Sequence, residues 1–219
     1  MYDPILYFDE MNLLQSEKDR RIKTSQQFFK AMLQFFAKQL LNLMTGTFLF
    51  EHTTEQYEDE LMDLYLLMAV DKYDSTVINK AKQFSKYIQE TTEKAVREAN
   101  GNENYRNAIT NGLRVFRADI PKSVLYVFSE ERAMNIALNE TNWMYNYLNH
   151  QNLVEAGHLT HTWVSMKDER VRASHVEADN QTVPINEPFI VNGYRMMFPL
   201  DDSMGAPVDE IIWCRCVEL

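Results

Sequence analysis

Three side chains near the end of the sequence, His175, Cys214 and Cys216, could together bind a metal ion. On an extended strand, residues i and i+2 point to the same side, so the two thiols would face one way. Two thiolates and an imidazole are ligands that zinc prefers in proteins. Asp168, His161 or water could supply the fourth ligand, so the sequence predicts a structural zinc ion as one option.

The spacing of these three residues matches none of the usual zinc-finger patterns. The alternative interpretation is therefore two buried structural cysteines beside a hydrogen-bonded histidine, with no cofactor. A disulfide between Cys214 and Cys216 is disfavoured, because an i, i+2 pair misses good disulfide geometry.

Asp168, Arg170 and Arg172 form a second group of residues that could carry chemistry. We expect them to form charge-assisted hydrogen bonds that clamp loops together. Glu140 falls on the apolar face of a preceding predicted helix, where it either reaches water at the edge or needs a partner such as Arg170 or Arg172. The functional alternative is general acid–base catalysis by Asp168 with His175. Against it, the sequence has no glycine-rich phosphate loop and no nucleophile elbow.

His158 and His161 lie three residues apart, beside Trp163. If this segment were helical, the two imidazoles would share a face. Such a pair more often belongs to the surface or to packing than to a metal site.

The composition predicts a globular chain built mostly from helices, long enough for one large domain or two small ones. Hydrophobic residues make up 45% of the 219 positions, with only six glycines and six prolines. The formal net charge of -10, from 22 basic and 32 acidic residues, argues against unaided binding to nucleic acid. No secretion signal is visible, and the apolar runs are too short to cross a membrane, so we expect synthesis in a reducing cytoplasm.

Apolar residues at helical spacing predict five helices that would position these groups. The stop signals are Thr45-Gly46 after the first helix, Asn100-Gly101 after the third and Pro121 after the fourth. The helices are expected at 15–44, 58–70, 77–99 and 105–116, with the fifth beginning near Ser129, whose hydroxyl suits an N-cap.

After Gly157, polar and turn residues become frequent and β-branched residues form short runs. Asn192-Gly193 between two such runs is a strong hairpin signal, and a last strand is expected over 211–217. The predicted fold class is α+β. A helical region over 1–128 would dock on partners, and a small α+β module with a β-hairpin would occupy 129–219.

Several short motifs follow one another in this last part of the sequence. They are Glu131-Arg132-Ala133, Glu140-Thr141, Trp163, Asp168 to His175, Gln181-Thr182-Val183, Pro188-Phe189, Phe198-Pro199 and Cys214-Arg215-Cys216. In this order they resemble the phage head morphogenesis family, the minor head proteins similar to protein F of phage Mu. The resemblance covers residues 129–219.

Two positions depart from the family's pattern. Asn180 stands where the family usually has glycine, and asparagine is the next best residue at positive φ. Trp213 stands where an asparagine usually precedes the cysteine pair, which puts any polar role of that position in doubt.

The resemblance implies a minor head protein of a tailed phage or prophage, not an enzyme. Its expected partners are the portal protein and the major capsid protein, with local or indirect contact to packaged DNA and none to a membrane. Its expected place is the head interior or portal region of the virion, and the host cytoplasm during assembly. Two rival hypotheses are a zinc-dependent hydrolase or nuclease built on Asp168 and His175, and a transfer module of a prophage toxin system.

Overall fold

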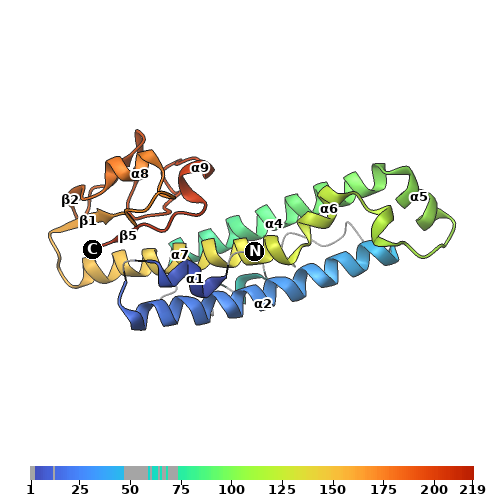
Figure 1. Ribbon diagram of the computed structural model, residues 1–219, viewed down its shortest axis with the longest axis horizontal. Helices are drawn as coiled ribbons and strands as arrows, with labels where there is room; N and C mark the ends of the chain where they lie inside the picture. Colours follow the sequence, from blue (N-terminus) through green and yellow to red (C-terminus); the bar gives the residue numbers. More distant parts are fainter. Residues whose placement is uncertain are drawn as a thin grey trace. The chain divides into compact units, whose positions relative to one another are not determined.

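The computed structural model has the predicted α+β fold and describes residues 3–11, 13–46, 59, 61–63, 65, 68 and 74–219 (Figure 1). The chain forms two compact units, which we call the helical unit (Gln27–Ile136) and the terminal unit (Tyr2–Gln26 with Ala137–Leu219). The helices are α1 (Pro4–Asp9), α2 (Gln15–Thr45), α4 (Ser75–Gly101), α5 (Glu103–Thr110), η1 (Arg117–Asp119), α6 (Lys122–Val127), α7 (Glu130–Glu155), α8 (Ala173–Ala178) and α9 (Val208–Ile211); the strands are β1 (Thr160–Val164), β2 (Thr182–Pro184), β3 (Phe189–Val191), β4 (Tyr194–Met196) and β5 (Val217–Glu218).

The long helices lie close to their predicted bounds: α2 ends at Thr45, as expected, whereas α4 continues through the predicted stop signal to Gly101. The Asp74 carboxylate accepts from the backbone N–H groups at the start of α4, and Ser129 Oγ accepts from Arg132 N at 3.1 Å at the start of α7. Most of the helix predicted over 58–70 lies outside the described residues. The helix predicted over 105–116 is shorter, because α5 stops before Gly112, which adopts a φ of +63°.

Aromatic side chains form the core of the helical unit. The rings of Phe28 and Tyr65 lie 6.1 Å apart, and Phe84 lies within 5.9 Å of both. The Arg132 guanidinium on α7 lies 5.0 Å over the ring of Phe36 on α2. These contacts, and the ribbons in Figure 1, place α2, α4 and the start of α7 side by side within this unit.

In the terminal unit, a small three-stranded antiparallel sheet of order β2-β1-β5 lies along the 137–155 segment of α7 (Figure 1). Strands β3 and β4 form the predicted hairpin. Its two turn residues, Asn192 and Gly193, have φ values of +51° and +79°, the positive angles that a type I′ turn requires.

The beginning of α2 packs against α7 within the terminal unit. Arg21 on α2 donates to Asn142 on α7, and Thr24 Oγ1 lies 2.9 Å from the Tyr145 hydroxyl. The predicted boundary between residues 128 and 129 stays a prediction, while the compact unit that holds the candidate site includes Tyr2–Gln26.

The strand predicted over 211–217 is wrong in its extent. Residues 208–211 form helix α9, residues 214–216 belong to no helix or strand, and only Val217 and Glu218 of this segment pair with β1. Trp213 separates helix from strand with a φ of +61°, which is incompatible with a continuous strand.

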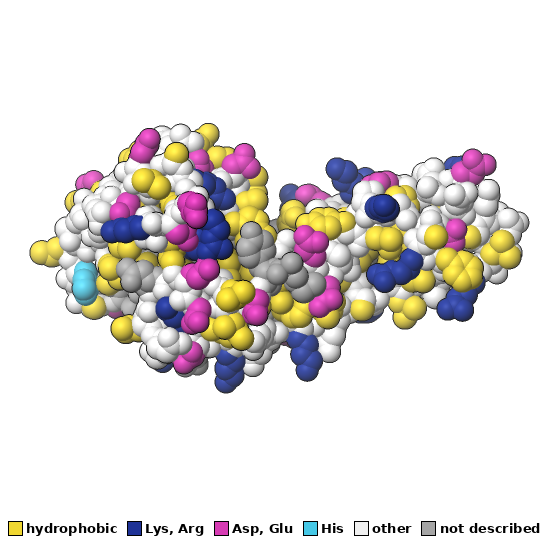
Figure 2. Space-filling model, in the orientation of Figure 1, with side chains coloured by type: hydrophobic (Ala, Val, Ile, Leu, Met, Phe, Trp, Pro, Cys, Tyr) yellow, Lys and Arg dark blue, Asp and Glu magenta, His cyan; other side chains and the backbone are white. Residues whose placement is uncertain are grey.

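The surface of the described residues mixes both signs of charge. On the face drawn in Figure 2, basic and acidic side chains are interspersed rather than gathered by sign. Among the described helices, none combines the length and the apolar character needed to cross a lipid bilayer.

Candidate functional site

The candidate site is built around a buried imidazole on α8. His175 is 1% exposed, and its ring stands edge-on to Trp163 of β1, with centroids 5.4 Å apart and planes at 89°. Trp163 is fully buried and also meets Phe189 of β3, at 5.5 Å. Two strands and one helix thus fix the position and the tilt of the histidine ring.

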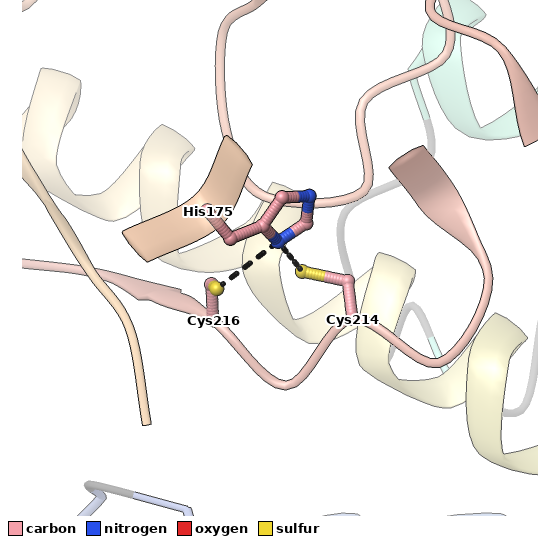
Figure 3. Close-up of side chains that lie close together, drawn as sticks. All are labelled: His175, Cys214 and Cys216. Carbon is pink, nitrogen blue, oxygen red and sulfur yellow. Dashed lines mark hydrogen bonds between the residues drawn. The ribbon is translucent and has the colours of Figure 1, made fainter. Parts of the chain in front are cut away.

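The two cysteine sulfurs face one nitrogen of this imidazole (Figure 3). Sγ of Cys214 lies 3.5 Å from His175 Nδ1, and Sγ of Cys216 lies 3.4 Å from the same atom. Both cysteines are unbridged and 2% exposed. The sequence therefore correctly placed both thiols on one side, although no strand ladder holds them.

The other imidazole nitrogen faces a carboxylate that the sequence analysis missed. Glu210 of α9 accepts from His175 Nε2 at 3.1 Å, from Ser174 Oγ at 2.8 Å and from Asn192 Nδ2 at 2.7 Å. Burial raises the pKa of Glu210, but these hydrogen bonds outweigh burial and hold it below its usual range. A charged carboxylate accepts, so His175 Nε2 carries a proton.

The two thiols titrate in opposite directions. Burial raises the pKa of Cys214, but hydrogen bonds with Cys216 and His175 outweigh burial and bring it well below its usual range. The pKa of Cys216 lies well above its usual range, because its thiol is hydrogen-bonded to Cys214 and is buried. Burial lowers the pKa of His175, but the hydrogen bond with Cys214 outweighs burial, and the pKa lies above its usual value.

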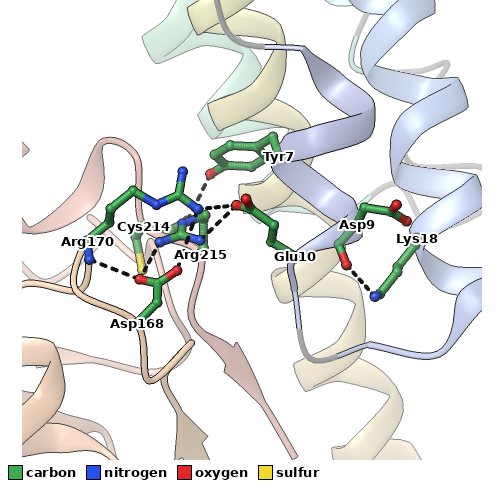
Figure 4. Close-up of polar contacts among 8 residues, drawn as sticks. All are labelled: Tyr7, Asp9, Glu10, Lys18, Asp168, Arg170, Cys214 and Arg215. Atoms are coloured by element: carbon green, nitrogen blue, oxygen red, sulfur yellow. Dashed lines mark hydrogen bonds and ion pairs between the residues drawn. The ribbon is translucent and has the colours of Figure 1, made fainter.

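A second group of charges lies on the other side of the Cys-x-Cys segment (Figure 4). Arg215 is 8% exposed and donates to Asp168 at 2.8 Å and to Glu10 at 3.2 Å. Arg170 contacts the same two carboxylates. The hydrogen bond from Arg215 holds the pKa of Asp168 below its usual range. Two arginines and two carboxylates from distant segments thus clamp the loop before α8 to the N-terminal residues.

The other predicted site residues make contacts that differ from those of the His175 cluster. Arg172 is the residue before α8 and donates to the carbonyl of Ile212. Glu140 is half-buried on α7, and its pairing with Arg170 or Arg172 stays a prediction. Arg170 contacts Glu10 and Asp168. The contacts of Asp168 are with arginines, whereas His175 contacts cysteines and Glu210, so the predicted acid–base pair of Asp168 with His175 does not form in this geometry.

Residues far away in the sequence hold the backbone of the two cysteines. The Cys214 carbonyl accepts from Tyr7 Oη at 3.1 Å and from Asn142 Nδ2 at 2.8 Å. The Cys216 carbonyl accepts from Asn146 Nδ2 at 3.2 Å. Because Asn142 and Asn146 lie four residues apart on α7, they share a face and reach both carbonyls.

A second buried cluster joins His150, His161 and Glu218. Glu218 Oε1 lies 2.8 Å from Nδ1 of His150 and 2.7 Å from Nδ1 of His161. Nε2 of His161 donates to the Glu187 carbonyl at 2.9 Å. The segment is not helical: His161 lies on strand β1, and His158 lies exposed before it, so the two imidazoles do not share a helix face.

The surroundings of His161 predict that the free energy of unfolding depends on pH. Burial lowers its pKa, but hydrogen bonds to Glu218 and to the Glu187 carbonyl raise it above the usual value. The protonated His161 ring therefore stabilises the folded state. This contribution is complete below the unfolded-state pKa of about 6.5 and is lost as the pH rises through the higher folded-state pKa. We expect the melting temperature of the wild type to exceed that of His161→Gln by more at about pH 6 than at about pH 9.

The exposed His158 offers the matched control for this experiment. His158→Gln should follow the wild type at both pH values, because an exposed imidazole keeps similar surroundings on unfolding. A gap between wild type and His161→Gln that grows with pH would contradict the assignment.

Comparison with known proteins relates the chain to a phage protein family. A family model described as phage Mu protein F like protein matches residues 78–219. The match begins within α4 and contains α5 to α9 and all the strands of the described residues, and with them His175, Cys214 and Cys216. No curated protein and no solved structure matches the chain.

Proposed function

Because the chain belongs to the phage Mu protein F like family, we propose that it is a minor head protein of a tailed phage or prophage. It acts in head assembly, in association with the portal protein and the inner face of the capsid. It contributes to the packaging or delivery of DNA, and its place is the virion head. The observation that carries this proposal is the family match, which extends over more than half of the chain.

The contacts of the described residues fit a structural role. The candidate site is closed, since His175, Cys214 and Cys216 are each at most 2% exposed. The carboxylate and imidazole named in the hydrolase hypothesis, Asp168 and His175, are each engaged by other residues. These groups build a compact corner that stabilises the fold.

Docking on the portal would use the helical unit. Leu113 and Phe116 lie between α5 and η1 with 62% and 60% of their surfaces exposed. Large apolar side chains at a protein surface contribute to interfaces when a partner covers them. Leu113 and Phe116 are therefore the positions at which substitutions should test docking on the portal.

We expect the full chain to co-purify with proheads assembled from the portal and capsid proteins of the same genome. The double variant Leu113→Glu, Phe116→Glu should be recovered in proheads at a reduced level, because two carboxylates would be buried in the interface. Leu159→Glu is the matched control, since Leu159 is 86% exposed in the terminal unit and should tolerate the charge.

Quantitative immunoblotting of purified proheads measures the recovery. Absence of the wild-type chain from proheads would overturn the assignment. Immunity genes beside this gene, in place of portal and capsid genes, would instead favour a transfer module of a toxin system.

A further inference from the structure

The arrangement at His175 Nδ1 is unusual for hydrogen bonding alone. An imidazole nitrogen offers either one lone pair or one proton, in the plane of the ring. Two sulfurs nevertheless lie at almost equal distances from this atom, 3.5 Å for Cys214 and 3.4 Å for Cys216. One proton cannot point at both sulfurs, whereas a cation between the three atoms contacts all of them.

The distances match those between ligands of a tetrahedral zinc ion. Bonds of about 2.3 Å to sulfur and about 2.05 Å to nitrogen, at the tetrahedral angle, put sulfur and nitrogen about 3.6 Å apart. The three ligand atoms of His175, Cys214 and Cys216 also lie within 4.8 Å of one another. The observed separations are within about 0.2 Å of this expectation.

The hydrogen bonds around His175 prepare it to bind a metal. Glu210 accepts the proton of Nε2, so a neutral ring presents the lone pair of Nδ1 to the two sulfurs. Histidine ligands of metals characteristically donate their second N–H to a carboxylate in this way. Ser174 and Asn192 in turn fix the carboxylate of Glu210.

We propose that His175 Nδ1, Cys214 Sγ and Cys216 Sγ bind one Zn²⁺ ion, with Glu210 as the residue that orients the histidine. Two thiolates balance the charge of the ion and exclude calcium and magnesium, which prefer oxygen ligands. Among the described residues, no fourth His, Cys, Asp or Glu joins this group, so water completes the tetrahedron. Zinc binds two thiolates and a neutral imidazole, so any proton on Cys214 Sγ, Cys216 Sγ or His175 Nδ1 is released to solvent on binding.

The second buried cluster serves as an internal comparison. Around a tetrahedral zinc ion, nitrogen and oxygen ligands would lie about 3.3 Å apart. Glu218 Oε1 lies only 2.8 Å and 2.7 Å from the nitrogens of His150 and His161, as in charge-assisted hydrogen bonds. Hydrogen bonds therefore join His150, His161 and Glu218, whereas the distances among His175, Cys214 and Cys216 fit zinc coordination.

The test measures metal on the full chain, purified under reducing conditions and dialysed against metal-free buffer. Elemental analysis and native mass spectrometry should find one zinc per chain. Replacing zinc by Co²⁺ should give the sulfur-to-cobalt charge-transfer absorption that only thiolate ligation produces. A chelator should lower the melting temperature, and added zinc should restore it.

Variants separate this site from its neighbour. Cys214→Ser with Cys216→Ser should lose the zinc and the cobalt charge-transfer band. Glu210→Gln should keep the ligands but weaken the affinity about 10- to 100-fold, as for other residues that orient a metal ligand. His161→Gln should still bind one zinc.

Two results would overturn the proposal. One is a wild-type chain that takes up no zinc when titrated with it. The other is a Co²⁺ complex without charge-transfer absorption, which would exclude the cysteines as ligands even if a variant failed to fold.

Discussion

Trp163→Ala is expected to lower the free energy of unfolding of the terminal unit by about 3–5 kcal/mol, the range for truncating a buried tryptophan. The indole is fully buried and contacts His175 and Phe189 at ring distances of 5.4 Å and 5.5 Å. Alanine would leave a cavity in the middle of the site, because the flanking strands fix the surrounding walls. Urea unfolding followed by far-UV circular dichroism measures the loss.

Leu159→Ala is the control, because Leu159 is one residue before β1 and 86% exposed. Its expected effect lies within about 0.5 kcal/mol of zero. If Trp163→Ala behaved like Leu159→Ala, the indole could not be the centre of this core.

The second large effect is expected for Arg21→Ala, which should cost about 3–5 kcal/mol, the range for breaking a buried charged network. Arg21 is 1% exposed and donates to the side-chain oxygens of Asn142 and Asn146. Without the guanidinium, these two buried oxygens lose their donor, and the carbonyls of Cys214 and Cys216 lose the support of ordered amides.

Arg20 provides a matched control one residue away. Its side chain is exposed, so Arg20→Ala removes the same charge and the same helix former without touching the network. Thermal and urea unfolding of both variants should give nearly wild-type values for Arg20→Ala. Equal losses in the two variants would mean that net charge, not the buried contacts, explains the effect of Arg21.

Local signals in the sequence were sufficient for the long helices and for the hairpin. The helix expected over 15–44 occurs as Gln15–Thr45, and the Asn192-Gly193 turn has the positive φ angles that its residues favour. Asn180 likewise has a φ of +63°, as expected for a residue that replaces glycine. Each of these features depends on neighbours within a few positions, which a single sequence displays directly.

The sequence was a poor guide where distant segments determine the structure. The strand predicted over 211–217 failed because β1 offers β5 only two pairing positions and Trp213 adopts a left-handed conformation. That φ of +61° suits asparagine better than tryptophan, which gives a backbone reason for the asparagine that the resemblance to the family leads one to expect there.

The candidate site shows the same division. His175 and the cysteine pair could be recognised from their types, because few other side chains bind soft metals. Glu210, Tyr7 and Asn142 could not, since the same residue types occur throughout the chain on solvated faces. Their roles follow only from packing between segments that no local pattern connects.

The bond between the Tyr7 hydroxyl and the Cys214 carbonyl has a consequence for the order of events during translation. These residues are 207 positions apart, and at about 5–20 residues per second the ribosome needs roughly 10–40 s to make the stretch between them. Throughout that interval Tyr7 has already been made, but its native partner Cys214 has not. The corner around His175 can therefore close only after Cys214 and Cys216 have left the ribosome.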